Sequence, residues 1–123
     1  MKTFEVKTKK GKKKTLSIEI GWYSNVTLAI RAFDYENGYP EPYTNLTVNF
    51  DIPMDKTTAF LNVEYGNEIV DYLIEAGFGE LTGRIMETDY VTFPEFKFYE
   101  DKLIEFDADN YDEYQERWCL VYE

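Results

Sequence analysis

The residues in this sequence that are best suited to do chemistry are the carboxylates near its C-terminal end. Six of them lie within twelve positions: Glu105, Asp107, Asp109, Asp112, Glu113 and Glu116. Grouped carboxylates can bind a divalent cation, work as a general acid and base, or pair with the Arg and Lys side chains of a partner. The other residue types in the chain decide among these uses.

Most catalytic and metal chemistry lacks its usual residues here. The chain has no histidine, one cysteine and two serines, so the common general base and the commonest metal ligand are missing. Asp107, Asp109, Asn110 and Asp112 are spaced like part of a calcium loop, but the central glycine and terminal glutamate of an EF-hand are absent. We therefore expect no catalytic residue, no metal site and no cofactor, and we expect that the protein is not an enzyme.

Charge is divided unevenly along the chain. The net charge is −11, yet seven of the thirteen basic residues lie within the first fourteen positions. From Thr15 onward there are 23 acidic residues and six basic ones. A surface of that composition repels phosphate and attracts a basic protein, which makes a basic nucleic-acid-binding protein the expected partner.

The basic residues at the start predict a hairpin over residues 1–15 with its turn around Gly11. Five lysines surround this turn: Lys9, Lys10, Lys12, Lys13 and Lys14. Lysines at a hairpin tip discourage strand-to-strand aggregation, and the same tip could contact nucleic acid weakly. The sequence leaves both uses open.

Alternating apolar residues predict strands through the first half of the chain. The predicted strands cover about 4–6, 16–22, 28–32, 46–50, 59–63, 81–87 and 91–99. Asn37, Gly38, Pro40 and Pro42 predict a loop, and Pro94 indicates an edge strand or a bulge. The order of elements predicts an α+β fold, a mainly antiparallel β-sheet with one or two packed helices, in a single domain over residues 1–123.

Two helices are expected. Asn67 is placed to cap the first and Gly77 to end it; its polar face carries Glu68, Asp71 and Glu75. The second lies within an acidic C-terminal segment, residues 100–123, and is predicted to run from about 110 to 119 with Asp109 as its cap. Its aromatic face consists of Tyr111, Tyr114 and Trp118, which either pack in the core or offer an anchor to a partner.

The cellular setting is expected to be the cytoplasm. Cys119 is the single cysteine, so no internal disulfide can form, as in most proteins of a reducing compartment. The first twenty residues contain no apolar segment typical of a secretory signal, and no apolar run is long enough to cross a membrane.

Several short runs in the sequence resemble a family of small proteins of unknown function from plasmids, phages and conjugative elements of Gram-positive bacteria. These runs are Gly21–Asn25, Leu28–Ile30, Glu41–Tyr43, Leu46–Asn49, Gly77–Arg84 and Val91–Phe96. The resemblance covers roughly Gly21 to Leu103 and leaves out the lysine turn and the acidic segment. It carries no catalytic motif, but it implies a counter-defence setting in which acidic proteins block nucleases.

The leading hypothesis is therefore an anti-CRISPR protein of the type II class that binds the basic guide-RNA or DNA channel of an effector nuclease. The expected contact face is the six carboxylates with Tyr111 or Tyr114 as anchor, and Glu68, Asp71 and Glu75 form a second candidate face. The alternatives are a DNA-mimic antirestriction protein, an accessory binding module of the mobile element, and a small hydrolase that uses a carboxylate pair.

Overall fold

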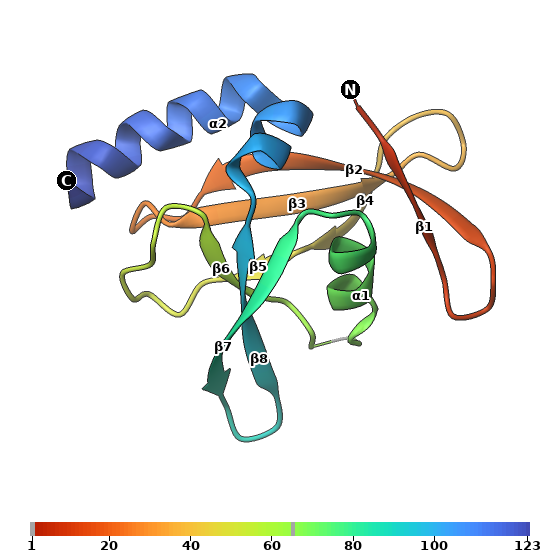
Figure 1. Ribbon diagram of the computed structural model, residues 1–123, viewed down its shortest axis with the longest axis horizontal. Helices are drawn as coiled ribbons and strands as arrows, with labels where there is room; N and C mark the ends of the chain where they lie inside the picture. Colours follow the sequence, from red (N-terminus) through yellow and green to blue (C-terminus); the bar gives the residue numbers. More distant parts are fainter. Residues whose placement is uncertain (1, 65) are drawn as a thin grey trace.

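The computed structural model describes residues 2–64 and 66–123 and shows two antiparallel sheets and two helices, which confirms the α+β prediction (Figure 1). The first sheet has the order β1-β2-β3-β4: β1 (Phe4–Lys7), β2 (Lys13–Trp22), β3 (Leu28–Asp34) and β4 (Glu41–Asn45). The second has the order β5-β6-β8-β7: β5 (Thr47–Val48), β6 (Thr58–Leu61), β8 (Thr92–Phe98) and β7 (Gly79–Glu87). The helices are α1 (Glu68–Glu75) and α2 (Glu100–Tyr122).

The two longest strands of the first sheet bury matching faces. In the β2–β3 pair Ile18 lies opposite Ala32 and Ile20 opposite Ile30, and all four side chains are buried. Because side chains alternate between the two faces of a strand, every second side chain lies on the core side of the sheet. The alternation that predicted these strands therefore also fixes their register, because a shift by one residue would turn the apolar face to water.

The chain passes from one sheet to the other at Leu46. The Leu46 N–H donates to the Ile30 carbonyl in the first sheet at 2.8 Å, and the Leu46 carbonyl accepts from the Asn62 N–H beyond β6 at 2.8 Å. The main core lies between the sheets and is rich in rings, with Phe60, Phe78 and Phe96 fully buried. Leu46 thus fixes the position of one sheet on the other from within the core.

Two predictions made from prolines are wrong in detail. The expected loop around Pro42 contains β4, an edge strand of the first sheet, where Pro42 lies opposite Phe33. Pro94 lies in β8, which is flanked by β6 and β7 and is not an edge strand. The irregularity is in the neighbouring β7, whose residues between Leu81 and Ile85 outnumber those they face on β8. A proline signals a break in the ladder, but it does not say which strand carries the extra residues.

Helix α1 has the expected length but not the expected cap. Asn67 occupies the N-cap position without a side-chain hydrogen bond to the helix. At the other end Gly77 has a φ of +73° and its N–H donates to the Ile74 carbonyl at 3.1 Å, a left-handed conformation that favours glycine. The helix buries Ile69, Tyr72 and Leu73 against the sheets.

Helix α2 begins ten residues earlier than expected, at Glu100, and bends at Asp107. Leu103 and Phe106 are buried in its first part, which explains the early start, since both need the helix to reach the core. Asp107 has non-helical backbone angles (φ −156°, ψ 68°). The sequence prediction that Asp109 caps the helix is therefore wrong; the bend lies two residues before it.

The bend supplies a hydrogen-bond acceptor to an unpaired stretch of β2. Strand β1 pairs with β2 only as far as Leu16, so the Ile20 N–H on the same side has no strand partner among residues 2–64 and 66–123. Asp107 Oδ2 accepts this N–H at 2.9 Å and also accepts the Asn110 side-chain amide at 2.8 Å. A buried N–H left without an acceptor is costly, so this carboxylate joins the helix to the sheet.

We predict that Asp107→Ala lowers the free energy of unfolding by about 1–3 kcal/mol, because it leaves the Ile20 N–H without an acceptor. The matched control is Asp109→Ala, an exposed carboxylate two residues away, which should change stability by no more than about 0.5 kcal/mol. Urea unfolding of both variants measures the difference. Equal losses in the two variants would contradict the assigned role of Asp107.

Candidate partner-binding surface on the C-terminal helix

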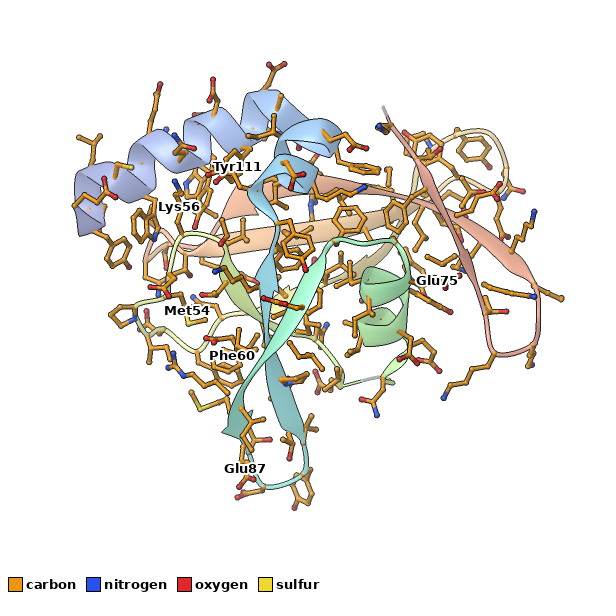
Figure 2. All side chains as sticks on the ribbon, viewed as in Figure 1. Met54, Lys56, Phe60, Glu75, Glu87 and Tyr111 are labelled. Atoms are coloured by element: carbon orange, nitrogen blue, oxygen red, sulfur yellow. The ribbon has the colours of Figure 1, made fainter. Side chains whose placement is uncertain are left out.

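One side of α2 is held to the body by hydrogen bonds from three aromatic side chains. Tyr114 Oη donates to the Lys56 carbonyl at 2.5 Å, Trp118 Nε1 to the Met54 carbonyl at 3.2 Å, and Tyr122 Oη to the Asn25 carbonyl at 2.5 Å. These rings recur every four residues and therefore share one face of the helix. In Figure 2 the labelled Met54 and Lys56 lie on the body side of α2, and the opposite side is left to solvent.

Tyr111 and Tyr114 are core residues and are not available as anchors for a partner. Their exposed fractions are 1% and 0%, so the anchor hypothesis is wrong and the alternative interpretation, ring packing, is confirmed. Tyr111 Oη donates to Glu100 Oε2 at 2.6 Å, and Lys56 Nζ lies 3.3 Å from the same carboxylate. The Tyr111 hydrogen bond, with help from Lys56, holds the pKa of Glu100 below its usual value. Burial, with the same hydrogen bond, raises the pKa of Tyr111 far above its ordinary range.

Three of the six carboxylates expected in the contact face already have partners in the protein. Asp107 is bound to Ile20 and Asn110, as described above. Glu105 pairs with Lys2 and with Lys102, the latter at 3.8 Å, and the Lys2 contact lowers the Glu105 pKa. Glu113 pairs with Arg117 at 3.2 Å. The six residues therefore do not act as one uniform acidic face.

The other three carboxylates form a narrower surface, which we call the acidic stripe: Asp109, Asp112 and Glu116. All are exposed, and within residues 2–64 and 66–123 none makes an ion pair. Their spacing of three and four residues places them in a row on the solvent side of α2. This row can offer carboxylate oxygens to Arg and Lys side chains without first breaking an internal pair.

The row continues one turn further into an exposed leucine that the sequence analysis missed. Leu120 follows Glu116 by four residues and is 85% exposed, and the neighbouring Val121 is also exposed. A shallow hollow beside it is lined by Gln115, Glu116, Cys119 and Leu120. The sequence did indicate this position, because Leu120 does not share the helical face of Tyr114 and Trp118 that packs in the core. It was missed because the predicted helix ended at Cys119.

The second candidate face lies elsewhere, next to the basic hairpin. On α1, Asp71 and Glu75 are exposed and Glu68 is half-buried. The Glu75 carboxylate accepts the Lys7 N–H of β1 at 3.5 Å, and Figure 2 shows Glu75 between α1 and β1. The structure thus does not join these residues to the acidic stripe.

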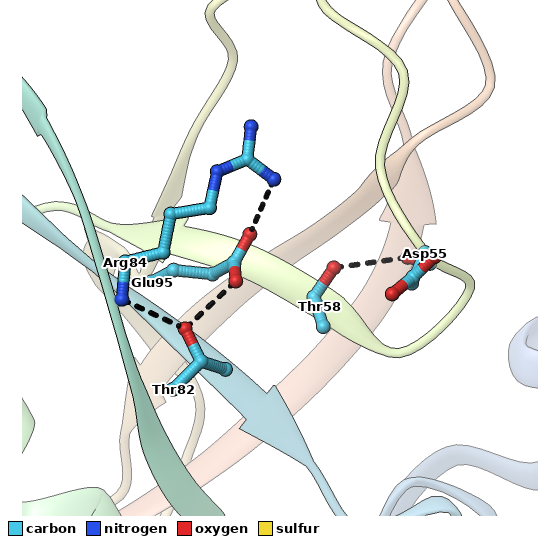
Figure 3. Close-up of polar contacts among 5 residues, drawn as sticks. All are labelled: Asp55, Thr58, Thr82, Arg84 and Glu95. Atoms are coloured by element: carbon cyan, nitrogen blue, oxygen red, sulfur yellow. Dashed lines mark hydrogen bonds and ion pairs between the residues drawn. The ribbon is translucent and has the colours of Figure 1, made fainter.

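A buried carboxylate in the second sheet was also missed by the sequence analysis. The Glu95 side chain is 8% exposed; Thr82 Oγ1 donates to one of its oxygens at 2.7 Å and Arg84 Nη1 lies 3.4 Å from the other (Figure 3). Thr82 and Arg84 belong to the irregular part of β7 that faces Glu95. Because both oxygens are engaged by the bulge, we assign this cluster to holding β7 on β8.

Neither a cluster of metal-ligand side chains nor a membrane-spanning helix is found in the described part of the chain. No group of three or more Cys, Asp or Glu side chains among these residues is arranged to hold a metal ion. No helix in residues 2–64 and 66–123 has the length and apolar character needed to cross a membrane.

The family model described as "Domain of unknown function (DUF4313)" matches residues 15–118. The chain belongs to this family. The match includes the acidic stripe, so the expectation that the family resemblance ends before the acidic segment is wrong; the lysines of the hairpin turn and Leu120 lie outside it. No curated protein and no solved structure matches the chain significantly.

We predict that Tyr111→Phe destabilises the protein by about 1–3 kcal/mol at pH 7, where Glu100 is ionised and accepts the tyrosine hydroxyl. A carboxylate whose folded-state pKa is lowered stabilises the fold above its unfolded-state pKa, about 4.3, and this contribution disappears as the pH falls through the folded-state value. The gap between wild type and variant should therefore narrow as the pH falls from 7 to about 3.

Denaturant unfolding at several pH values measures this gap. The control is Tyr90→Phe, because Tyr90 is fully exposed near the β7–β8 turn. A gap that keeps its size across the pH range would show that the Tyr111 hydroxyl does not act through the ionised Glu100.

Proposed function

We propose that this protein is a non-enzymatic inhibitor encoded by a mobile element, whose acidic stripe occupies a basic nucleic-acid-binding surface on another protein. The observation that carries the proposal is a row of exposed carboxylates, Asp109, Asp112 and Glu116, that make no ion pair with the described residues and lead to the exposed Leu120. The partner class that fits best is a type II CRISPR effector nuclease in the cytoplasm of a bacterial host. The contact would block engagement of guide RNA or DNA.

Charge alone does not give this surface high affinity. An exposed ion pair contributes about 0.2–1 kcal/mol, so three such pairs account for about 0.6–3 kcal/mol. Burial of a leucine side chain adds about 1.5–3 kcal/mol. Leu120 can therefore provide the apolar anchor that Tyr111 and Tyr114, being buried, cannot.

The charge density of α2 favours a surface that binds single strands. From Asp109 to Arg117 the helix carries four carboxylates and one arginine. Eight residue steps cover about 12 Å of helix, which gives one net charge per about 4 Å. Duplex DNA has one charge per about 1.7 Å and a single strand one per about 3.4 Å. The stripe is thus closer to a single strand, which favours a guide-RNA groove over the duplex channel of a restriction enzyme.

We predict that Asp109→Asn, Asp112→Asn and Glu116→Gln together weaken binding to a guide-free type II effector nuclease by about 3- to 150-fold at low salt. The loss should shrink at high salt, where exposed charges are screened. Leu120→Ala alone should weaken binding by about tenfold or more, with little salt dependence, because it removes apolar contact.

Calorimetric titration at two salt concentrations measures both effects. The matched control replaces the same number of charges on α1, as Glu68→Gln, Asp71→Asn and Glu75→Gln, and should leave binding unchanged. Unchanged binding by the folded α2 variants would contradict the proposal that the acidic stripe binds the nuclease. Binding to a restriction enzyme but not to the effector nuclease would favour the antirestriction alternative.

A further inference from the structure

The hairpin between β1 and β2 holds its lysines in an ordered turn. The Thr8 N–H donates to the Lys12 carbonyl at 2.8 Å, the Gly11 N–H donates to the Thr8 carbonyl at 2.9 Å, and Thr8 Oγ1 accepts the Lys12 N–H at 3.2 Å. Gly11 has a φ of +78°, which favours glycine at this corner. The ammonium groups therefore start from a fixed backbone loop.

The lysines of the turn differ in whether they make ion pairs with other residues of the protein. Lys14 pairs with Asp34 at 3.1 Å and lies over the Tyr43 ring at 4.6 Å, and Lys13 lies 3.8 Å from Glu5. The other three lysines, which we call the lysine tip, are exposed and make no ion pair with the part of the chain that the structure describes: Lys9, Lys10 and Lys12. The chain holds 24 acidic residues against 13 basic ones, so unpaired lysines do not result from a shortage of carboxylates.

The lysine tip is separated from the acidic stripe along β2. Lys13 opens this strand, and Ile20, whose N–H binds Asp107 of α2, comes seven residues later. Seven residues of strand cover about 23 Å, which is more than two Debye lengths at about 0.1 M salt. In Figure 1 the hairpin turn and the C-terminal end of α2 lie at opposite ends of the molecule. A phosphate at the tip is thus exposed to the lysine charges and largely screened from the carboxylates of the acidic stripe.

An exposed aromatic ring lies beside the base of the hairpin. Tyr43 is 38% exposed on the edge strand β4, and Lys14 fixes the position of its ring from the neighbouring hairpin. Bases of a single strand stack on rings placed next to basic side chains, and this combination is common in proteins that bind single strands without sequence preference.

We propose that the lysine tip, together with Tyr43 at the base of the hairpin, contacts a single-stranded nucleic acid. The inference deepens the proposed function and rests on it in one respect: a nuclease whose guide RNA is only partly seated offers the vacant part of its basic groove to the acidic stripe and RNA phosphates to the lysine tip. One molecule with separated acidic and basic surfaces can then bind a complex of protein and RNA at two points.

The test measures RNA binding by the protein alone, so that its outcome does not depend on the nuclease. The probe is a fluorescein-labelled oligouridine of about 20 nucleotides, followed by anisotropy between about 50 and 200 mM salt. Three lysine–phosphate contacts predict a slope of about −2 for log K against log salt, or about 15-fold weaker binding over this range. Lys9→Gln, Lys10→Gln and Lys12→Gln together should remove most of the affinity and flatten the slope, and Tyr43→Ala should weaken binding about tenfold.

The matched control removes the same charge elsewhere, as Lys2→Gln, Lys97→Gln and Lys102→Gln, and should change RNA affinity by less than about twofold, since these lysines are remote from the tip. Equal losses in the two triple variants, or no binding by the wild type at about 50 mM salt, would overturn the proposal. Competition by polyglutamate as effective as that by RNA would also overturn it, since the tip would then be a contact for any polyanion. The Asp109, Asp112 and Glu116 variant should retain RNA binding even if it shows no effect on the nuclease, which separates failure of this proposal from failure of the proposed function.

Discussion

The arrangement of the molecule depends on one hydrogen bond. The Ile20 N–H, on the side of β2 that β1 leaves unpaired, needs an acceptor. Asp107 provides it by leaving the helical conformation, and this places the bend of α2 against the sheet. The direction of the rest of the helix then follows from Tyr114, Trp118 and Tyr122, which reach three backbone carbonyls on the body. Because the inner face of α2 is fixed in this way, the orientation of its outer carboxylates is fixed as well.

The same strand separates the two charged surfaces. The first part of β2 pairs with β1 and leads to the lysine turn, and its later part lies against α2. A ten-residue strand with different neighbours along its two halves keeps opposite charges from neutralising one another. The acidic stripe and the lysine tip can therefore act on different chemical groups at the same time.

The sequence predicted the fold well wherever local pattern decides it. Alternation identified β2 and β3, and Gly77 identified the end of α1. The start of α2 was missed because Leu103 and Phe106 are separated from the aromatic face by the bend at Asp107, which breaks the helical period. The bend allows Asp107 to accept the N–H of Ile20, a residue 87 positions away in the sequence. No local sequence pattern carries such information.

The candidate site was predictable only in part for the same reason. Composition placed acidic residues on the last helix, but it could not tell Asp107 and Glu105, which have partners in the fold, from Asp109, Asp112 and Glu116, which make no ion pair with any residue that the structure describes. The bulge between Leu81 and Ile85 has a further consequence. Strand β7 is the outer strand of its sheet and exposes both of these apolar side chains. A regular, flat strand with these side chains at the edge would be prone to pair with a second copy of the protein. The segment held by Glu95 breaks the regular spacing of the outward backbone groups, which is unfavourable for pairing with a second strand at this edge.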